Sequence, residues 1–75
     1  MKIKVRTFGS LTEILDSEFL MEATDTHGLV NSLTKQYAQL NGRKLLIAVN
    51  NTIIQENMTL AEHDTVALMP PYSGG

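Results

Sequence analysis

The sequence ends on TVALMPPYSGG, residues 65–75, and this stretch decides how the rest of the chain is interpreted. Small and apolar residues alternate through 65–69, which predicts a β-strand. Alternate side chains then face opposite sides of a sheet: Val66 and Leu68 on one side, Ala67 and Met69 on the other. Neither Pro70 nor Pro71 can donate to a sheet ladder, so the strand is expected to stop before them.

The tail that follows this strand, residues 70–75, suggests a chemistry. Glycine carries no Cβ, so Gly74 and Gly75 would pass through a channel too narrow for other residues. The α-carboxylate of Gly75 would then be the reactive group at the tip. The alternative is a terminus without function, because chain ends are commonly poorly ordered. We therefore treat 70–75 as a candidate flexible tail whose two prolines stiffen its exit.

The first part of the chain predicts two strands followed by the main helix. Residues 2–8 alternate, with Ile3, Val5 and Thr7 on one face, and residues 18–23 alternate again. We expect these two strands to be antiparallel, with one short helical turn over 11–16 between them. A longer helix is then predicted from an Asp25-Thr26 cap to a closing Asn41-Gly42, because apolar residues recur at helical spacing: Leu29, Leu33 and Tyr37.

The remaining elements define the fold class. Residues 45–49 form a nearly all-apolar run that predicts a strand, and residues 53–54 can form a brief one after the turn residues 50–52. The element order predicts an α+β fold, in which one main helix packs on one face of a mixed sheet. The other face stays open, and we expect Phe8 and Met69 to lie on it beside the tail. Grouped, exposed apolar side chains of this kind usually mark a binding surface.

Composition narrows the functional classes. The 75 residues predict a single domain over 1–75, and the absence of cysteine excludes disulfides and thiolate metal sites. A net charge of −2 argues against a nucleic-acid partner. No apolar run reaches the roughly 20 residues that span a bilayer, and no signal-peptide pattern opens the sequence, so we expect no membrane partner and a cytoplasmic location. His27 and His63 lack ligand-spaced partners, so no metal site is expected.

Several motifs in the second half of the chain carry a resemblance to a known family. They are Leu-Leu-Ile-Ala-Val-Asn at 45–50, then Leu60, Asp64 and Val66-Ala67, and finally Pro-Pro-Tyr-Ser-Gly-Gly at 70–75. The chain resembles the β-grasp (ubiquitin-like) fold. More narrowly, it resembles the small subunit of molybdopterin synthase, a family of sulfur carriers in molybdenum cofactor biosynthesis. Residues 2–8 and Leu11-Thr12-Glu13 fit the first strand and short helix of that family.

The resemblance implies a chemistry for the tail. An E1-like adenylating enzyme would use ATP to activate Gly75 as an acyl-adenylate, and a sulfur nucleophile would displace the adenylate to leave a thiocarboxylate. The tail would then enter the large subunit of molybdopterin synthase, in a heterotetramer, and donate sulfur to cyclic pyranopterin monophosphate to form the dithiolene. Gly74 gives a thin cross-section, Ser73 can hydrogen-bond the channel wall, and Tyr72 stands where the family usually has valine. No permanently bound cofactor is implied.

Two other readings of the sequence stay open at this point. A sulfur carrier of thiamine biosynthesis or a ubiquitin-like modifier would have the same fold and a terminal Gly-Gly. A plain β-grasp interaction module would have an inert tail, and its binding would survive removal of Gly74 and Gly75.

Overall fold

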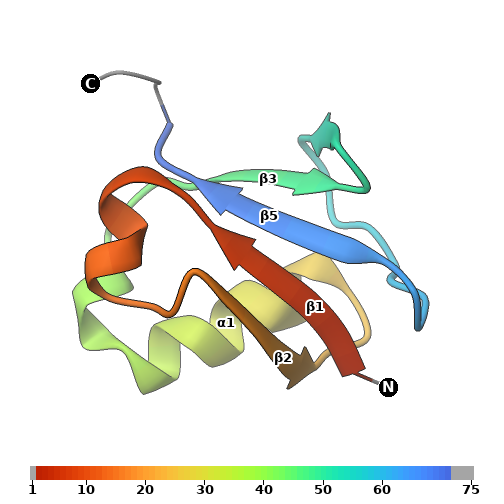
Figure 1. The fold of residues 1–75 in the computed structure, drawn as a ribbon, viewed down its shortest axis with the longest axis horizontal. Coiled ribbons are helices and arrows are strands. Elements are labelled where there is room, and N and C mark those ends of the chain that lie inside the picture. Colours follow the sequence, from red (N-terminus) through yellow and green to blue (C-terminus); the bar gives the residue numbers. More distant parts are fainter. Residues whose placement is uncertain (1, 72–75) are drawn as a thin grey trace.

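The structure is a computed structural model, and it describes residues 2–71 (Figure 1). One α-helix and two short 3-10 helices accompany five strands in the described part of the chain. In chain order the elements are β1 (Lys2–Thr7), η1 (Gly9–Glu13), β2 (Glu18–Glu22), α1 (Thr26–Gln36), η2 (Ala38–Leu40), β3 (Leu46–Val49), β4 (Thr52–Ile54) and β5 (Thr65–Met69).

The five strands form one mixed sheet in the order β2-β1-β5-β3-β4. β5 is central, and it pairs in parallel with β1 and antiparallel with β3. β2 and β4 are the outer strands, each antiparallel to its single neighbour. Figure 1 shows α1 lying across one face of this sheet. The predicted α+β architecture is therefore confirmed, and each predicted strand is present to within one residue at its ends.

The core lies between α1 and the covered face of the sheet. The alternation in β1 and β5 places Ile3, Val5, Val66 and Leu68 on this face, and all four are fully buried. Leu29 and Leu33 of α1 are also buried there, so the helical stripe predicted from the sequence does face the sheet. Apolar burial of this kind contributes about 1.5–3 kcal/mol for each large side chain and supplies most of the stability.

The main helix ends earlier than the sequence predicts. α1 stops at Gln36, Tyr37 is extended with φ −125° and ψ 94°, and η2 follows. Gly42 does adopt a left-handed φ of +78°, but it lies in a turn in which the Arg43 N–H donates to the Leu40 carbonyl. Leu40 is buried although it lies outside α1. Leu40 continues the apolar spacing of α1 from outside the helix. The sequence pattern therefore predicted a helix that extends beyond its actual end at Gln36.

A polar network ties the start of α1 to the loop between β4 and β5. Asp25 is the N-cap, and its Oδ1 accepts a hydrogen bond from Gly28 N at 2.8 Å. Asn57 lies across from it: its Oδ1 accepts from His27 N at 2.9 Å, and its Nδ2 donates to Asp25 Oδ2 at 3.2 Å. Thr26 is buried, and its hydroxyl accepts from Met58 N at 3.0 Å. The helix start and the loop thus satisfy each other's polar groups.

A second network holds the start of β5. Asp64 Oδ2 accepts from Ala61 N and its Oδ1 accepts from Asn50 Nδ2, both at 2.8 Å. Asn50 Oδ1 in turn accepts from Thr65 N at 3.0 Å. Asn50 and Asn51 both have positive φ, 51° and 71°, as the tight hairpin between β3 and β4 requires. The hairpin between β3 and β4 is therefore linked to the turn before β5 by hydrogen bonds of the Asn50 and Asp64 side chains.

The first prediction concerns Asn57. Asn57→Ala removes the acceptor for His27 N and the donor to Asp25, and it should lower the free energy of unfolding by about 1–2 kcal/mol. The measurement is urea unfolding followed by circular dichroism. Asn31→Ala is the matched control, because Asn31 is exposed on α1, and it should change stability by less than about 0.5 kcal/mol. Equal effects of the two variants would contradict the capping role.

The second prediction concerns acid. The Gly28 backbone N–H, followed by the Asn57 amide, lowers the pKa of Asp25 below its ordinary 3.8, and the Ala61 N–H with the Asn50 amide does the same for the pKa of Asp64. A lowered folded-state pKa stabilises the fold above the unfolded value, and this contribution is lost as the pH falls through the folded value. The wild type should therefore lose stability between about pH 5 and about pH 2. A double Asp25→Asn, Asp64→Asn variant should show a shallower loss, and an unchanged slope would contradict the assignment.

Candidate functional site

The candidate site begins where β5 ends. β5 lies at the centre of the sheet, and the chain leaves it through Pro70, which is half-buried, and Pro71, which is exposed. The other predicted tail residues, Tyr72, Ser73, Gly74 and Gly75, lie outside the described residues. The structure thus fixes where the tail starts and which surface adjoins that point.

A glycine outside the tail supports its exit. Gly9 follows β1 with φ +61°, and a Cβ built on it would lie 3.0 Å from Pro70 Cγ and 3.3 Å from Pro70 Cδ. Gly9 therefore serves two needs at once: a left-handed backbone and a close approach by the proline ring. In the sequence, Gly9 directly follows the strand predicted over residues 2–8. The contact joins residues 61 positions apart (70 − 9), so no local pattern reveals it.

Apolar side chains on the open face lie next to this exit. Met69 is half-buried and pairs in register with Leu46 of β3. The Phe8 N–H donates to the Leu68 carbonyl at 3.1 Å, which brings Phe8 alongside the end of β5, and Phe8 is 41% exposed. The strand register places further apolar residues on the same face: Ala67, Ala48 and Ile53. We call this set, Phe8, Leu46, Ala48, Ile53, Ala67 and Met69, the open-face patch.

Basic side chains border the open-face patch on the β1 side. Lys2, Lys4 and Arg6 alternate with the buried residues of β1 and are exposed on the open face. The Arg6 guanidinium carbon lies 5.7 Å from the centroid of the Phe8 ring, within cation–π range, and Arg6 Nε lies 3.7 Å from Glu18 Oε1. A partner that covers this face meets an apolar area beside the tail and a cationic border on β1.

Other candidate chemistry is not assembled in the described part of the chain. Among residues 2–71, no three His, Cys, Asp or Glu side chains lie close enough together to hold a metal ion. His63 is exposed, and its Nε2 lies 4.0 Å from Glu62 Oε2. Asp25 and Asp64 have lowered pKa values because they accept hydrogen bonds in turns, so they are structural carboxylates. No helix in the described residues is long and apolar enough to cross a membrane.

Comparison with known families and solved structures shows which family the chain resembles. A model described as the ThiS family matches residues 5–75. The chain belongs to the ThiS family. The resemblance drawn from the sequence is confirmed, and the mixed sheet with one helix is the ubiquitin-like β-grasp fold of sulfur-carrier proteins.

Several solved structures resemble this chain over nearly its whole length. The chain is 30% identical to a chain in the complex of subunits 1 and 2 of molybdopterin-converting factor from Helicobacter pylori 26695, with a TM-score of 0.73 and 100% of both chains covered. It is 20% identical to a putative molybdopterin converting factor subunit 1 from Pyrococcus furiosus, with a TM-score of 0.86 and 96% and 99% covered. It is also 23% identical to the small archaeal modifier protein 1 from Methanosarcina acetivorans, with a TM-score of 0.81 and 99% and 96% covered.

The third prediction tests the support of the exit by Gly9. Gly9→Ala places a Cβ on a residue with a left-handed φ and brings that Cβ against Pro70. Gly42→Ala places a Cβ on a residue with a left-handed φ (+78°) as well, but no atom lies within 4 Å of the added Cβ. Gly42→Ala should destabilise the fold by about 1 kcal/mol, and Gly9→Ala should cost about 1 kcal/mol more because its neighbour must move. The measurement is the unfolding free energy, together with the amide shift of Met69. Equal costs and an unmoved Met69 amide would contradict the support.

Proposed function

We propose that this chain is a sulfur carrier and serves as the small subunit of a molybdopterin synthase. The observation that carries the proposal is the place where the tail begins: Pro70 directly follows the central strand β5, next to the open-face patch, and the sequence then runs to a terminal Gly-Gly. A partner that binds this face is placed to receive the tail. The H. pylori relative comes from a complex of subunits 1 and 2, which supports a large-subunit partner for this chain.

The proposed chemistry takes place on the Gly75 carboxylate. A carboxylate is a poor electrophile, so an E1-like enzyme first joins it to the adenylyl group of ATP and releases pyrophosphate. A sulfur nucleophile then attacks the acyl carbon, AMP leaves, and Gly75 carries a thiocarboxylate. Within the large subunit the sulfur passes to the pterin substrate, water supplies the replacing oxygen, and the tail leaves as a carboxylate.

The rest of the chain contributes binding and positioning to this cycle. We assign Phe8 and Met69 to the partner interface, because both lie on the open face at the β5 end from which the tail departs. Pro70 and Pro71 restrict the backbone as it leaves the sheet, which reduces the entropy lost when the tail enters a channel. The catalytic side chains belong to the large subunit, and the cycle takes place in the cytoplasm.

Two observations favour related carriers as second candidates. The matching family is the ThiS family, and one fold relative is named as a small archaeal modifier protein. Co-purification separates the pathways: a large molybdopterin synthase subunit supports the first assignment, a thiazole synthase supports a thiamine carrier, and isopeptide adducts on lysines support a modifier. A module with an inert tail would bind its partner equally well without Gly74 and Gly75.

The fourth prediction tests the chemistry at Gly75. The chain, incubated with its activating enzyme, ATP and a sulfur source, should gain about 16 Da, because sulfur replaces one carboxylate oxygen. Intact-mass spectrometry measures the gain. Deletion of Gly75, or its extension by one glycine, should abolish sulfur transfer to the pterin substrate without altering the melting temperature. The proposal is wrong if the mass never appears in the wild type, and a melting curve that collapses on deletion would indicate a structural tail instead.

A further inference from the structure

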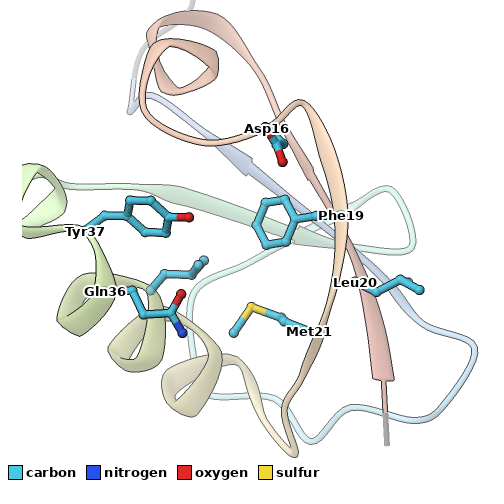
Figure 2. Close-up of a pocket in the computed structure, with 7 residues that line it drawn as sticks. Asp16, Phe19, Leu20, Met21, Gln36 and Tyr37 are labelled. Atoms are coloured by element: carbon cyan, nitrogen blue, oxygen red, sulfur yellow. The ribbon is translucent and has the colours of Figure 1, made fainter.

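The part of the open face that lies on β1 and β2 carries an exposed leucine next to a cation. Figure 2 shows Phe19 and Met21 pointing from β2 toward α1, while Leu20 between them points away from α1. Leu20 is 61% exposed, the largest exposed fraction among the large apolar side chains of residues 2–71. The strand register places it directly opposite Lys4 of β1. This face therefore combines apolar surface with positive charge at one point.

The other two cations of β1 on this face are matched by carboxylates of β2. Arg6 stands opposite Glu18 in the register, and Arg6 Nε lies 3.7 Å from Glu18 Oε1. Lys2 stands opposite Glu22. Opposite charges at directly facing positions attract each other across an antiparallel pair. Both carboxylates of β2 are thus already engaged at the sheet, and neither stands opposite the central cation of β1.

Lys4 is that central cation, and the sheet offers it no counter-charge. Its register partners are Leu20 on β2 and Thr65 on β5, and neither carries a charge. Among residues 2–71, no carboxylate forms an ion pair with the Lys4 ammonium. The β1–β2 part of the open face holds three cations and two carboxylates, a local charge of +1 (3 − 2), although the whole chain carries −2.

We propose that the large subunit that covers the open face places a carboxylate side chain against Lys4 and an apolar side chain against Leu20. The inference rests on the proposed function, because it concerns the partner that the tail enters. It extends the partner interface from the open-face patch across β1 to β2. Charges on facing protein surfaces are generally complementary, so an unmatched ammonium favours an acidic group on the partner.

The position of Lys4 decides what its contact can affect. Lys4 pairs with Thr65 at the start of β5, whereas the tail leaves from the other end of that strand. The contact therefore lies at the rim of the interface and away from the chemistry at Gly75. Rim charges act mainly on the rate of association and on its salt dependence. Loss of the Lys4 charge should accordingly slow binding without changing the sulfur transfer step.

The fifth prediction measures association of the full-length chain with the large molybdopterin synthase subunit by stopped flow. Lys4→Gln should slow association about threefold at about 50 mM salt and less at about 500 mM, because salt screens the lost attraction. Lys4→Arg keeps the charge and should associate at the wild-type rate. Lys35→Gln is the matched control, because it removes the same charge from α1 on the covered side of the sheet, and it should change the rate by less than about 1.5-fold.

A separate variant tests the apolar part of the contact. Leu20→Ala should speed dissociation at least about threefold, because part of the apolar surface of the partner returns to water. An unchanged dissociation rate would overturn the contact at Leu20. Equal association rates for Lys4→Gln and Lys35→Gln, or a Lys4→Arg rate as slow as that of Lys4→Gln, would overturn the acidic contact at Lys4.

Failure of this inference is distinguishable from failure of the proposed function. A large subunit that binds the wild type, together with the mass gain at Gly75, keeps the proposed function in place whatever the Lys4 and Leu20 variants do. A wild type that neither gains mass nor binds the large subunit would overturn the proposed function, and this inference with it.

Discussion

The structure depends on the double pairing of β5. This strand is held by β1 on one side and by β3 on the other, and Val66 and Leu68 are fully buried beneath it. The parallel β1–β5 ladder joins the two ends of the sequence, and it leaves the β1–β2 pair on one flank and the β3–β4 pair on the other. β5 cannot shift its register without breaking two ladders and moving its buried side chains to the open face. The point at which the tail begins is therefore among the most constrained in the chain.

The residues that carried the family resemblance have two different roles. Asn50 and Asp64 bond to each other and to the backbone at the start of β5, and Leu60 and Val66 are core residues. Their match therefore identifies the fold, since any chain with this hairpin and turn benefits from them. Gly74 and Gly75 lie outside the described residues, and the resemblance assigns the chemistry to them. Full-length structural relatives that share this fold carry the names of different systems.

The sequence predicted the elements whose signals are local, and it missed those that depend on distant contacts. Alternation located the strands, and Asp25 was expected at the helix start, where its side chain does accept from Gly28 N. The predicted end of α1 was wrong because Leu40 keeps the apolar spacing in a different backbone conformation. The sequence did not reveal two stabilising contacts: Asn57, which caps the helix from the loop before β5, and Gly9, whose missing Cβ leaves room for Pro70. Both contacts join segments that are far apart in the sequence, so they can be recognised only once the fold is known.

The placement of the tail exit bears on how a carrier could serve several partners. A partner that takes the Gly75 carboxylate must approach the end of β5, where Met69 and Phe8 lie. Both side chains lie at the same end of the sheet, next to the point at which the chain leaves β5 through Pro70. Two partners that each take this carboxylate would therefore have to bind in turn, because both need the same end of the sheet.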